Sequence, residues 1–199
     1  MNWIEQLHFW DRDLTLAINS LHCAQTDYLW LLFSAKSIWF VMYAIVAFFM
    51  FKRLGWRCAL LWIVAIVLMI ACCDQFSNLI KGLVARLRPC RDPYMLNNGL
   101  WVLEGGGRYG FFSAHAANTM AFAVGSAMAL RSDGSRCKGY LVWIYCWAFL
   151  VGVSRIFVGK HFLGDVLVGF AVGAIIAYLI GSLTLWLTER VTFFRPASR

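Results

Sequence analysis

Apolar residues in this chain occur in stretches long enough to cross a lipid bilayer. A membrane-spanning helix needs about 20 mostly apolar residues, and five stretches meet that requirement: residues 29–51, 57–80, 111–130, 139–157 and 162–187. Backbone polar groups in lipid must be satisfied within a helix or a closed barrel, so an open sheet is excluded here. The pattern predicts an all-α, polytopic membrane bundle of about five transmembrane helices, forming one domain over residues 1–199.

A shorter amphipathic segment precedes these stretches. Within residues 1–22, large apolar side chains recur at helical spacing, at Trp3, Leu7, Trp10, Leu14 and Ile18. This pattern is typical of a helix that lies in the membrane interface. The first residues are acidic and aromatic where a cleavable signal peptide carries basic residues, so a signal peptide is not expected.

Charge predicts the orientation of the bundle. Of the 199 residues, 61% are apolar and 14% are charged, which excludes an ordinary soluble domain. If the five predicted helices cross the membrane one after another, each end of the bundle receives nine Lys and Arg residues. The end that carries the C-terminus then has two acidic residues and the other end has eight. Lys81, Arg88 and Arg155 can be set aside because a binding site would explain them. Nine Lys and Arg residues then remain at the end that carries the C-terminus, and six remain at the other end. The positive-inside rule then predicts a cytoplasmic C-terminus and a site that faces the periplasm of a bacterial inner membrane.

Three clusters of ionisable residues stand at the ends of the apolar stretches. They are Lys81 with Arg88-Pro89, then Ser113-Ala114-His115, and last Ser154-Arg155 followed by His161 and Asp165. Such residues are costly at membrane depth and are usually kept for function. Arg and Lys side chains bind phosphate oxygens, and the amides of a helix N-terminus form an anion pocket. The clusters therefore predict a site for a phosphate group and a nucleophile.

The spacings within the clusters predict which of these side chains lie together. Lys81 and Arg88 are seven residues apart, so one helix that ends at Pro89 would carry both on one face. His161 and Asp165 are four apart, so the carboxylate can accept the Nδ1 proton and fix the tautomer of the ring. The alternative for Lys81 or Arg88 taken singly is an interfacial side chain. For Ser113 the alternative is a helix cap, for His115 a hydrogen-bonded core histidine, and for the His161–Asp165 pair a simple surface contact.

Other polar residues receive simpler predictions. Arg86 and Arg91 match no motif position and are expected to contact lipid headgroups. Asn118 is expected to bond to a neighbouring helix. Lys36 falls inside the first apolar stretch, and a true span over 37–54 would place it at the outer interface instead. Lys36 and Asp74 are a possible pair, with contact to a second phosphate or a sugar as the lesser alternative.

The three clusters together resemble the motifs of the type 2 phosphatidic acid phosphatase (PAP2) superfamily, in its integral-membrane branch. The first and third clusters match at every defining position, whereas Phe112 and Ala114 replace a proline and a glycine of the second motif. The resemblance implies that His161 attacks phosphorus to form a phosphohistidine, that Asp165 orients it, and that His115 protonates the leaving oxygen. It implies neither metal nor other cofactor. The residues it implies for phosphate binding are Lys81, Arg88, Ser113, Ala114 and Arg155.

The expected function is hydrolysis of a phosphate ester or diphosphate of a membrane lipid. Undecaprenyl diphosphate and lipid A phosphate are the leading candidates, and phosphatidylglycerol phosphate or phosphatidic acid are the alternatives. A vanadate haloperoxidase-like enzyme is a weaker alternative, because those proteins are soluble. A transporter or scaffold would leave the ordered clusters unexplained. The predicted partners are the bilayer and the lipid substrate, without nucleic acid, and no oligomeric state follows. The loop 89–110 is apolar and glycine-rich, and we expect it to form an outer active-site loop that can act as a lid.

Overall fold

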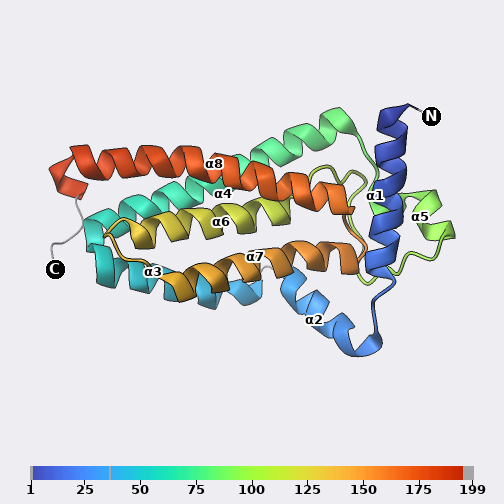
Figure 1. The fold of residues 1–199 in the computed structure, drawn as a ribbon, viewed down its shortest axis with the longest axis horizontal. Helices are drawn as coiled ribbons and strands as arrows, with labels where there is room; N and C mark the ends of the chain where they lie inside the picture. Colours follow the sequence, from blue (N-terminus) through green and yellow to red (C-terminus); the bar gives the residue numbers. More distant parts are fainter. Residues whose placement is uncertain (1, 36, 195–199) are drawn as a thin grey trace.

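The computed structural model describes residues 2–35 and 37–194. The long helices run side by side along one axis (Figure 1). The helix α1 lies at one end of this bundle, and α8 finishes at the other end. Four helical segments in the described residues are long and apolar enough to cross a membrane: Ser37–Leu54, Trp56–Val84, Lys138–Phe157 and Leu163–Arg190. They correspond to η1 (Ser37–Trp39) with α3 (Phe40–Leu54), and to α4 (Trp56–Val84), α7 (Lys138–Phe157) and α8 (Leu163–Arg190). The prediction of an all-α membrane bundle is confirmed.

The fifth predicted segment is α6 (Ala114–Arg131), the central helix of the bundle. It packs against α4, α7 and α8 and buries most of its small side chains, so protein rather than lipid surrounds it and its sequence is less apolar. Gly169 and Gly173 of α8 form the close contact. A Cβ atom at Gly169 would come within 2.6 Å of the Ser113 carbonyl oxygen, and one at Gly173 would clash with the Ala117 carbonyl oxygen. Small residues here let the two helices approach closely.

The first span covers Ser37–Leu54, so the alternative over 37–54 is confirmed and the stretch 29–51 is wrong at its start. The helix α2 (Ala24–Ser34) ends before the span and lies at an angle to the bundle (Figure 1). It packs on α7, where the rings of Trp30 and Phe157 stack with centroids 4.1 Å apart. Trp30 and Phe33 of α2 thus make packing contacts at the end of the bundle, whereas Leu29 and Leu32 are exposed. Lys36 lies outside the described residues.

The N-terminal helix α1 (Trp3–Asn19) runs across the end of the bundle (Figure 1). A capping box between Asn2 and Glu5 begins it. Most of the predicted apolar stripe faces outward, since Trp3, Leu7, Trp10 and Leu14 are all exposed, as an interfacial helix requires. Ile18 packs instead against the buried cluster that contains Ile156. Between α4 and α6, the chain forms η2 (Pro89–Arg91) and α5 (Pro93–Asn97), and η3 (Thr192–Phe194) follows α8.

Candidate active site

The first cluster does not lie on one helix. The helix α4 ends at Val84, because Ala85 adopts a left-handed conformation with φ of 50°. Residues 86–88 then pair with 108–110: the Arg88 amide donates to the Arg108 carbonyl at 3.1 Å and the Gly110 amide to the Arg86 carbonyl at 2.9 Å. The prediction of a continuous helix to Pro89 is therefore wrong, because this strand-like pairing with the distant loop replaces the last helical turn.

Arg86 is half-buried in the site, and two carboxylates hold its guanidinium. In extended chain, alternate side chains point to the same side, so Arg86 and Arg88 both face inward. Nη1 of Arg86 donates to the Asp165 carboxylate at 2.8 Å, and Nη2 donates to Asp11 of α1 at 2.6 Å. The sequence prediction for Arg86 was wrong. The only signal was its position two residues before Arg88, and it becomes informative once the segment is known to be extended.

His161 and Asp165 meet at the start of α8. Nδ1 of His161 lies 3.4 Å from Oδ2 of Asp165, and the carboxylate is fully buried. The same Oδ2 accepts from the Phe162 amide at 3.1 Å. Burial lowers the pKa of His161 to about 4, because it disfavours the charged ring; Asp165 opposes this effect, and the positive charges of Arg155 and Arg88 add to it. The ring is thus neutral at pH 7.

Arg155 lies in the last turn of α7, beside this pair. It is only 3% exposed, and its guanidinium donates to the Ser34 hydroxyl. Its Nε is buried and has no hydrogen-bond partner among residues 2–35 and 37–194. An unpaired buried cationic donor is costly, so the position fits an anion. The neighbouring Lys160 pairs instead with Glu104 of the loop, a contact that the sequence did not predict.

The second cluster caps α6. The Ser113 hydroxyl accepts from the Ala116 amide at 3.4 Å, so the capping alternative is realised, and Ala114 is the first helical residue. The Ser113 amide donates to the Asp165 carbonyl at 2.9 Å. This bond joins the second cluster to the third and places the N-terminus of α6, with its free amides, against the His161–Asp165 pair.

Gly110 joins the first cluster to the third. A Cβ atom there would lie 2.9 Å from Cγ of Arg88 and 3.3 Å from Oδ2 of Asp165, so the two side chains meet across this glycine. Lys81 lies in the last turn of α4, at the same end of the bundle. Among the described residues, no group of three His, Cys, Asp or Glu side chains is arranged to hold a metal ion.

The helix α1 clamps both sides of the segment that carries His161. The Asn19 amide donates to the carbonyls of Ile156 and Phe157 at 3.0 and 3.2 Å, at the end of α7. The Thr15 hydroxyl accepts from the Leu163 amide at 2.9 Å, and the Asp11 carboxylate from the Gly164 amide at 2.7 Å, at the start of α8. These three polar side chains, four residues apart, satisfy helix ends that would otherwise lack partners.

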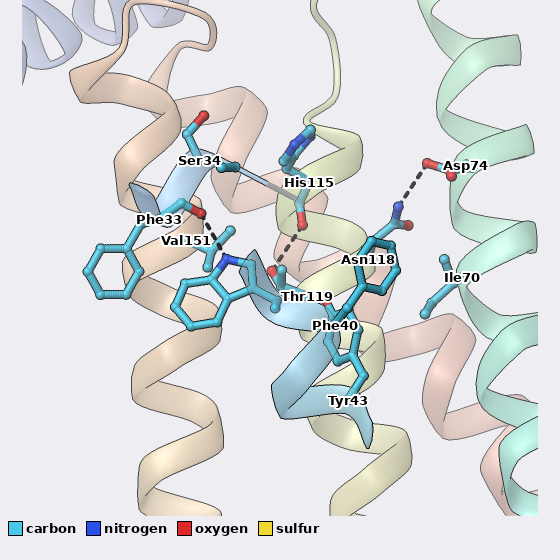
Figure 2. A pocket seen from close by; sticks show the side chains of 12 residues that line it. Phe33, Ser34, Phe40, Tyr43, Ile70, Asp74, His115, Asn118, Thr119 and Val151 are labelled. Carbon is cyan, nitrogen blue, oxygen red and sulfur yellow. Dashed lines mark hydrogen bonds between the residues drawn. The ribbon is translucent and has the colours of Figure 1, made fainter. Parts of the chain in front are cut away.

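A cavity of about 300 Å³ opens beside His115 (Figure 2). Aromatic side chains of α3 form one wall, and Asp74 and Asn118 form part of another. The Asn118 amide donates to the Asp74 carboxylate at 2.8 Å, so the expected bond from Asn118 to a neighbouring helix is present. Ser34, which binds Arg155, also lines the cavity. The cavity therefore reaches from the phosphate-binding candidates into the apolar interior.

Comparison with known proteins decides the family. The family model of the PAP2 superfamily matches residues 56–189. The chain belongs to the PAP2 superfamily. It is also 32% identical over 196 residues to a lipid A 4′-phosphatase of Bacteroides thetaiotaomicron, covering 97% of this chain and 85% of that protein. A lipid A 4′-phosphatase of Porphyromonas gingivalis is 32% identical over 182 residues, covering 90% and 75%.

A solved structure has the same fold. The transmembrane PAP2-type phosphatidylglycerolphosphate phosphatase of Bacillus subtilis superposes with a TM-score of 0.72 at 21% identity, covering 96% of this chain and 90% of that one. The predicted membership of the PAP2 superfamily and the predicted activity, a membrane lipid phosphatase, are thereby confirmed. The prediction that this chain is an integral membrane protein is confirmed as well.

Proposed function

We propose that this PAP2 enzyme removes the 4′-phosphate of lipid A through a phosphohistidine on His161. The observation that carries the chemistry is the neutral His161 ring held at Nδ1 by the buried Asp165. A carboxylate in that position fixes the proton on Nδ1 and leaves Nε2 as the nucleophile. The substrate assignment is supported by the two lipid A 4′-phosphatases, which this chain matches over most of their length.

The first step transfers the phosphoryl group to the enzyme. Nε2 of His161 attacks phosphorus in line, the P–N bond forms as the P–O bond to the sugar breaks, and His115 gives its proton to the leaving oxygen. Charge spreads over the equatorial oxygens of the phosphoryl group in the transition state. Preorganised donors stabilise that charge, and those proposed here are Lys81, Arg88, Arg155, the Ser113 hydroxyl and the backbone amides that begin at Ala114.

The second step releases phosphate. His115, now neutral, takes a proton from water as the water oxygen attacks phosphorus. The P–N bond breaks, inorganic phosphate leaves, and His161 and His115 return to their starting states. The cations of the protein supply the electrostatic stabilisation in both steps, and we propose that no metal or other cofactor takes part.

We propose that the site faces the periplasm from the inner membrane. All three clusters lie at the end of the bundle that carries α1, and the opposite end has the excess of Lys and Arg once the site residues are set aside. The loop 89–110 then stands outside, beside the outer leaflet. A lipid phosphate in that leaflet would reach His161 without crossing the membrane.

The test is phosphate release by purified protein from four lipids: lipid A, undecaprenyl diphosphate, phosphatidylglycerol phosphate and phosphatidic acid. We expect the highest kcat/KM with lipid A and a product that retains its 1-phosphate, identified by mass spectrometry. His161→Ala should abolish release, and its melting and elution in detergent should match those of the wild type. A preference for another lipid would reject the substrate assignment, and activity in His161→Ala would reject the nucleophile.

A further inference from the structure

Two polar side chains in the cavity beside His115 have no part in the phosphoryl chemistry. Asp74 of α4 and Asn118 of α6 both line the cavity, and they face each other in Figure 2. Asp74 lies within a segment apolar enough to cross a membrane. A carboxylate at such depth is costly and usually marks a functional position, so the pair is a candidate binding site.

The hydrogen bond within the pair defines what it can bind. An ionised carboxylate only accepts hydrogen bonds, so the NH₂ group of Asn118 must face Asp74, and the 2.8 Å contact agrees. The Asn118 oxygen, Oδ1, is then directed elsewhere, and it is buried without a partner among the described residues. That oxygen is one acceptor and the second carboxylate oxygen of Asp74 is another, and a ligand with O–H or N–H donors can pair with both.

The remaining cavity wall selects among ligands with such donors. Trp39, the last residue of η1, and Phe40 and Tyr43 of α3 also line it. Aromatic faces against one side of a ligand, with hydrogen-bond acceptors against its edge, suit a sugar ring, which has apolar C–H faces and a polar rim. A cavity of about 300 Å³ is large enough for one such ring.

A second cavity adjoins the first one, at greater depth along α3 and α4. Its volume is about 310 Å³, it shares Tyr43 and Ile70 with the first, and its lining side chains are apolar apart from the Tyr43 hydroxyl. Polar acceptors near His115 and an apolar extension beyond them match a sugar that carries an acyl chain. A diacylglycerol or a polyprenol would fill the apolar part but would bring no donor to the polar pair.

We propose that Asp74 and Asn118 form a subsite for the sugar of the leaving group, binding its hydroxyl or amide N–H groups while an acyl chain occupies the deeper cavity. This inference rests on the proposed lipid A activity and names the residues that give it selectivity. A site built to hydrogen-bond a substrate group rejects analogues that lack the group, because its own buried acceptors stay unpaired. Lipids whose leaving group has no donor are therefore disfavoured.

Two variants test the subsite. Asp74→Asn keeps the shape and the acceptor for Asn118 but replaces the second acceptor with an N–H donor, and Asn118→Leu removes the free oxygen. We expect kcat/KM for lipid A to fall about 10- to 100-fold in each variant. Hydrolysis of p-nitrophenyl phosphate, whose leaving group has no donor, should stay at the wild-type rate. Asn78→Leu, at an exposed position of α4 outside the cavity, is the matched control and should change neither rate.

Equal losses with both substrates, or no loss with either, would overturn the subsite. Binding of a phosphate-free, acylated glucosamine disaccharide, measured by titration calorimetry in detergent, separates this inference from the proposed function. The wild type should bind it, and Asp74→Asn should bind at least 10-fold more weakly. If the wild type binds the disaccharide but does not hydrolyse lipid A, the proposed function fails and the subsite stands. Equal affinity in the two proteins, or no binding to the wild type, rejects the subsite.

Discussion

Replacing Arg86 with Gln should slow catalysis without weakening substrate binding. Both terminal nitrogens of Arg86 are held by carboxylates, at 2.8 Å from Asp165 and 2.6 Å from Asp11, so this side chain positions the orienting carboxylate. Removing one partner of a buried ion pair costs about 3–5 kcal/mol of stability. The share that falls on the geometry of His161 and Asp165 should lower kcat about 10- to 100-fold, as is typical when the support of a site residue is lost.

The assay is steady-state hydrolysis of lipid A by detergent-purified protein, with the folded fraction determined by elution and melting. KM should change little in Arg86→Gln, and Arg86→Lys should retain part of the rate because it can pair with one carboxylate. Arg91→Gln, at an exposed position five residues along the chain, should behave as the wild type. Asp11→Asn should lower kcat by a similar factor. In the double variant with Arg86→Gln and Asp11→Asn, the combined loss, expressed as free energy, should be smaller than the sum of the two single losses. A wild-type kcat in Arg86→Gln, or a raised KM alone, would refute a positioning role.

Four further outcomes are expected. Because the pKa of His161 is about 4, the rate should persist as pH falls below 6.5 and should be lost near 4, where the ring gains a proton. In Asp165→Asn the carboxylate that favours the charged ring is gone, so this limb should move to lower pH while kcat falls; an unmoved limb would separate the two residues. EDTA should leave the rate unchanged and vanadate should inhibit, as a mimic of pentacoordinate phosphorus; a loss in EDTA that magnesium restores would contradict a metal-free site. With native cysteines replaced, Asn98→Cys should react with an impermeant maleimide on spheroplasts and Ser132→Cys should not, whereas the reverse would place the site in the cytoplasm. Gly173→Leu should lower the melting temperature, since a side chain there meets the Ala117 backbone and overpacking costs about 1–3 kcal/mol.

The sequence predicted the parts of the site that depend on local spacing. His161 lies two residues before α8 and Asp165 lies in its first turn, so a separation of only four residues brings the two together. Ser113 caps α6 because its position precedes an apolar helix. The bundle was equally predictable, since bilayer thickness sets the length of an apolar run. These features depend on neighbours in the chain, and periodicity reports such neighbours directly.

The parts that were missed depend on residues far apart in the chain. The end of α4 at Val84 follows from pairing with 108–110, and no proline or glycine marks it. Arg86 pairs with Asp165, which lies 79 residues away. A lone arginine at a membrane surface looks the same in sequence whether it meets lipid or a carboxylate. The start of the first span was left open for a related reason, since α2 is a separate helix that packs on α7, and its apolar residues resemble the beginning of a span.

The contacts of α1 set an order for the biogenesis of the enzyme. This helix leaves the ribosome before α7 and α8, yet its three clamping side chains bond to the end of α7 and the start of α8, which are 137 to 153 residues later in the chain. Each long helix can enter the membrane before those bonds exist, so the inserted chain is complete as a bundle before it is complete as a catalyst. Until its last helix is made, the nascent protein should therefore be unable to attack the phosphate groups of the membrane that receives it.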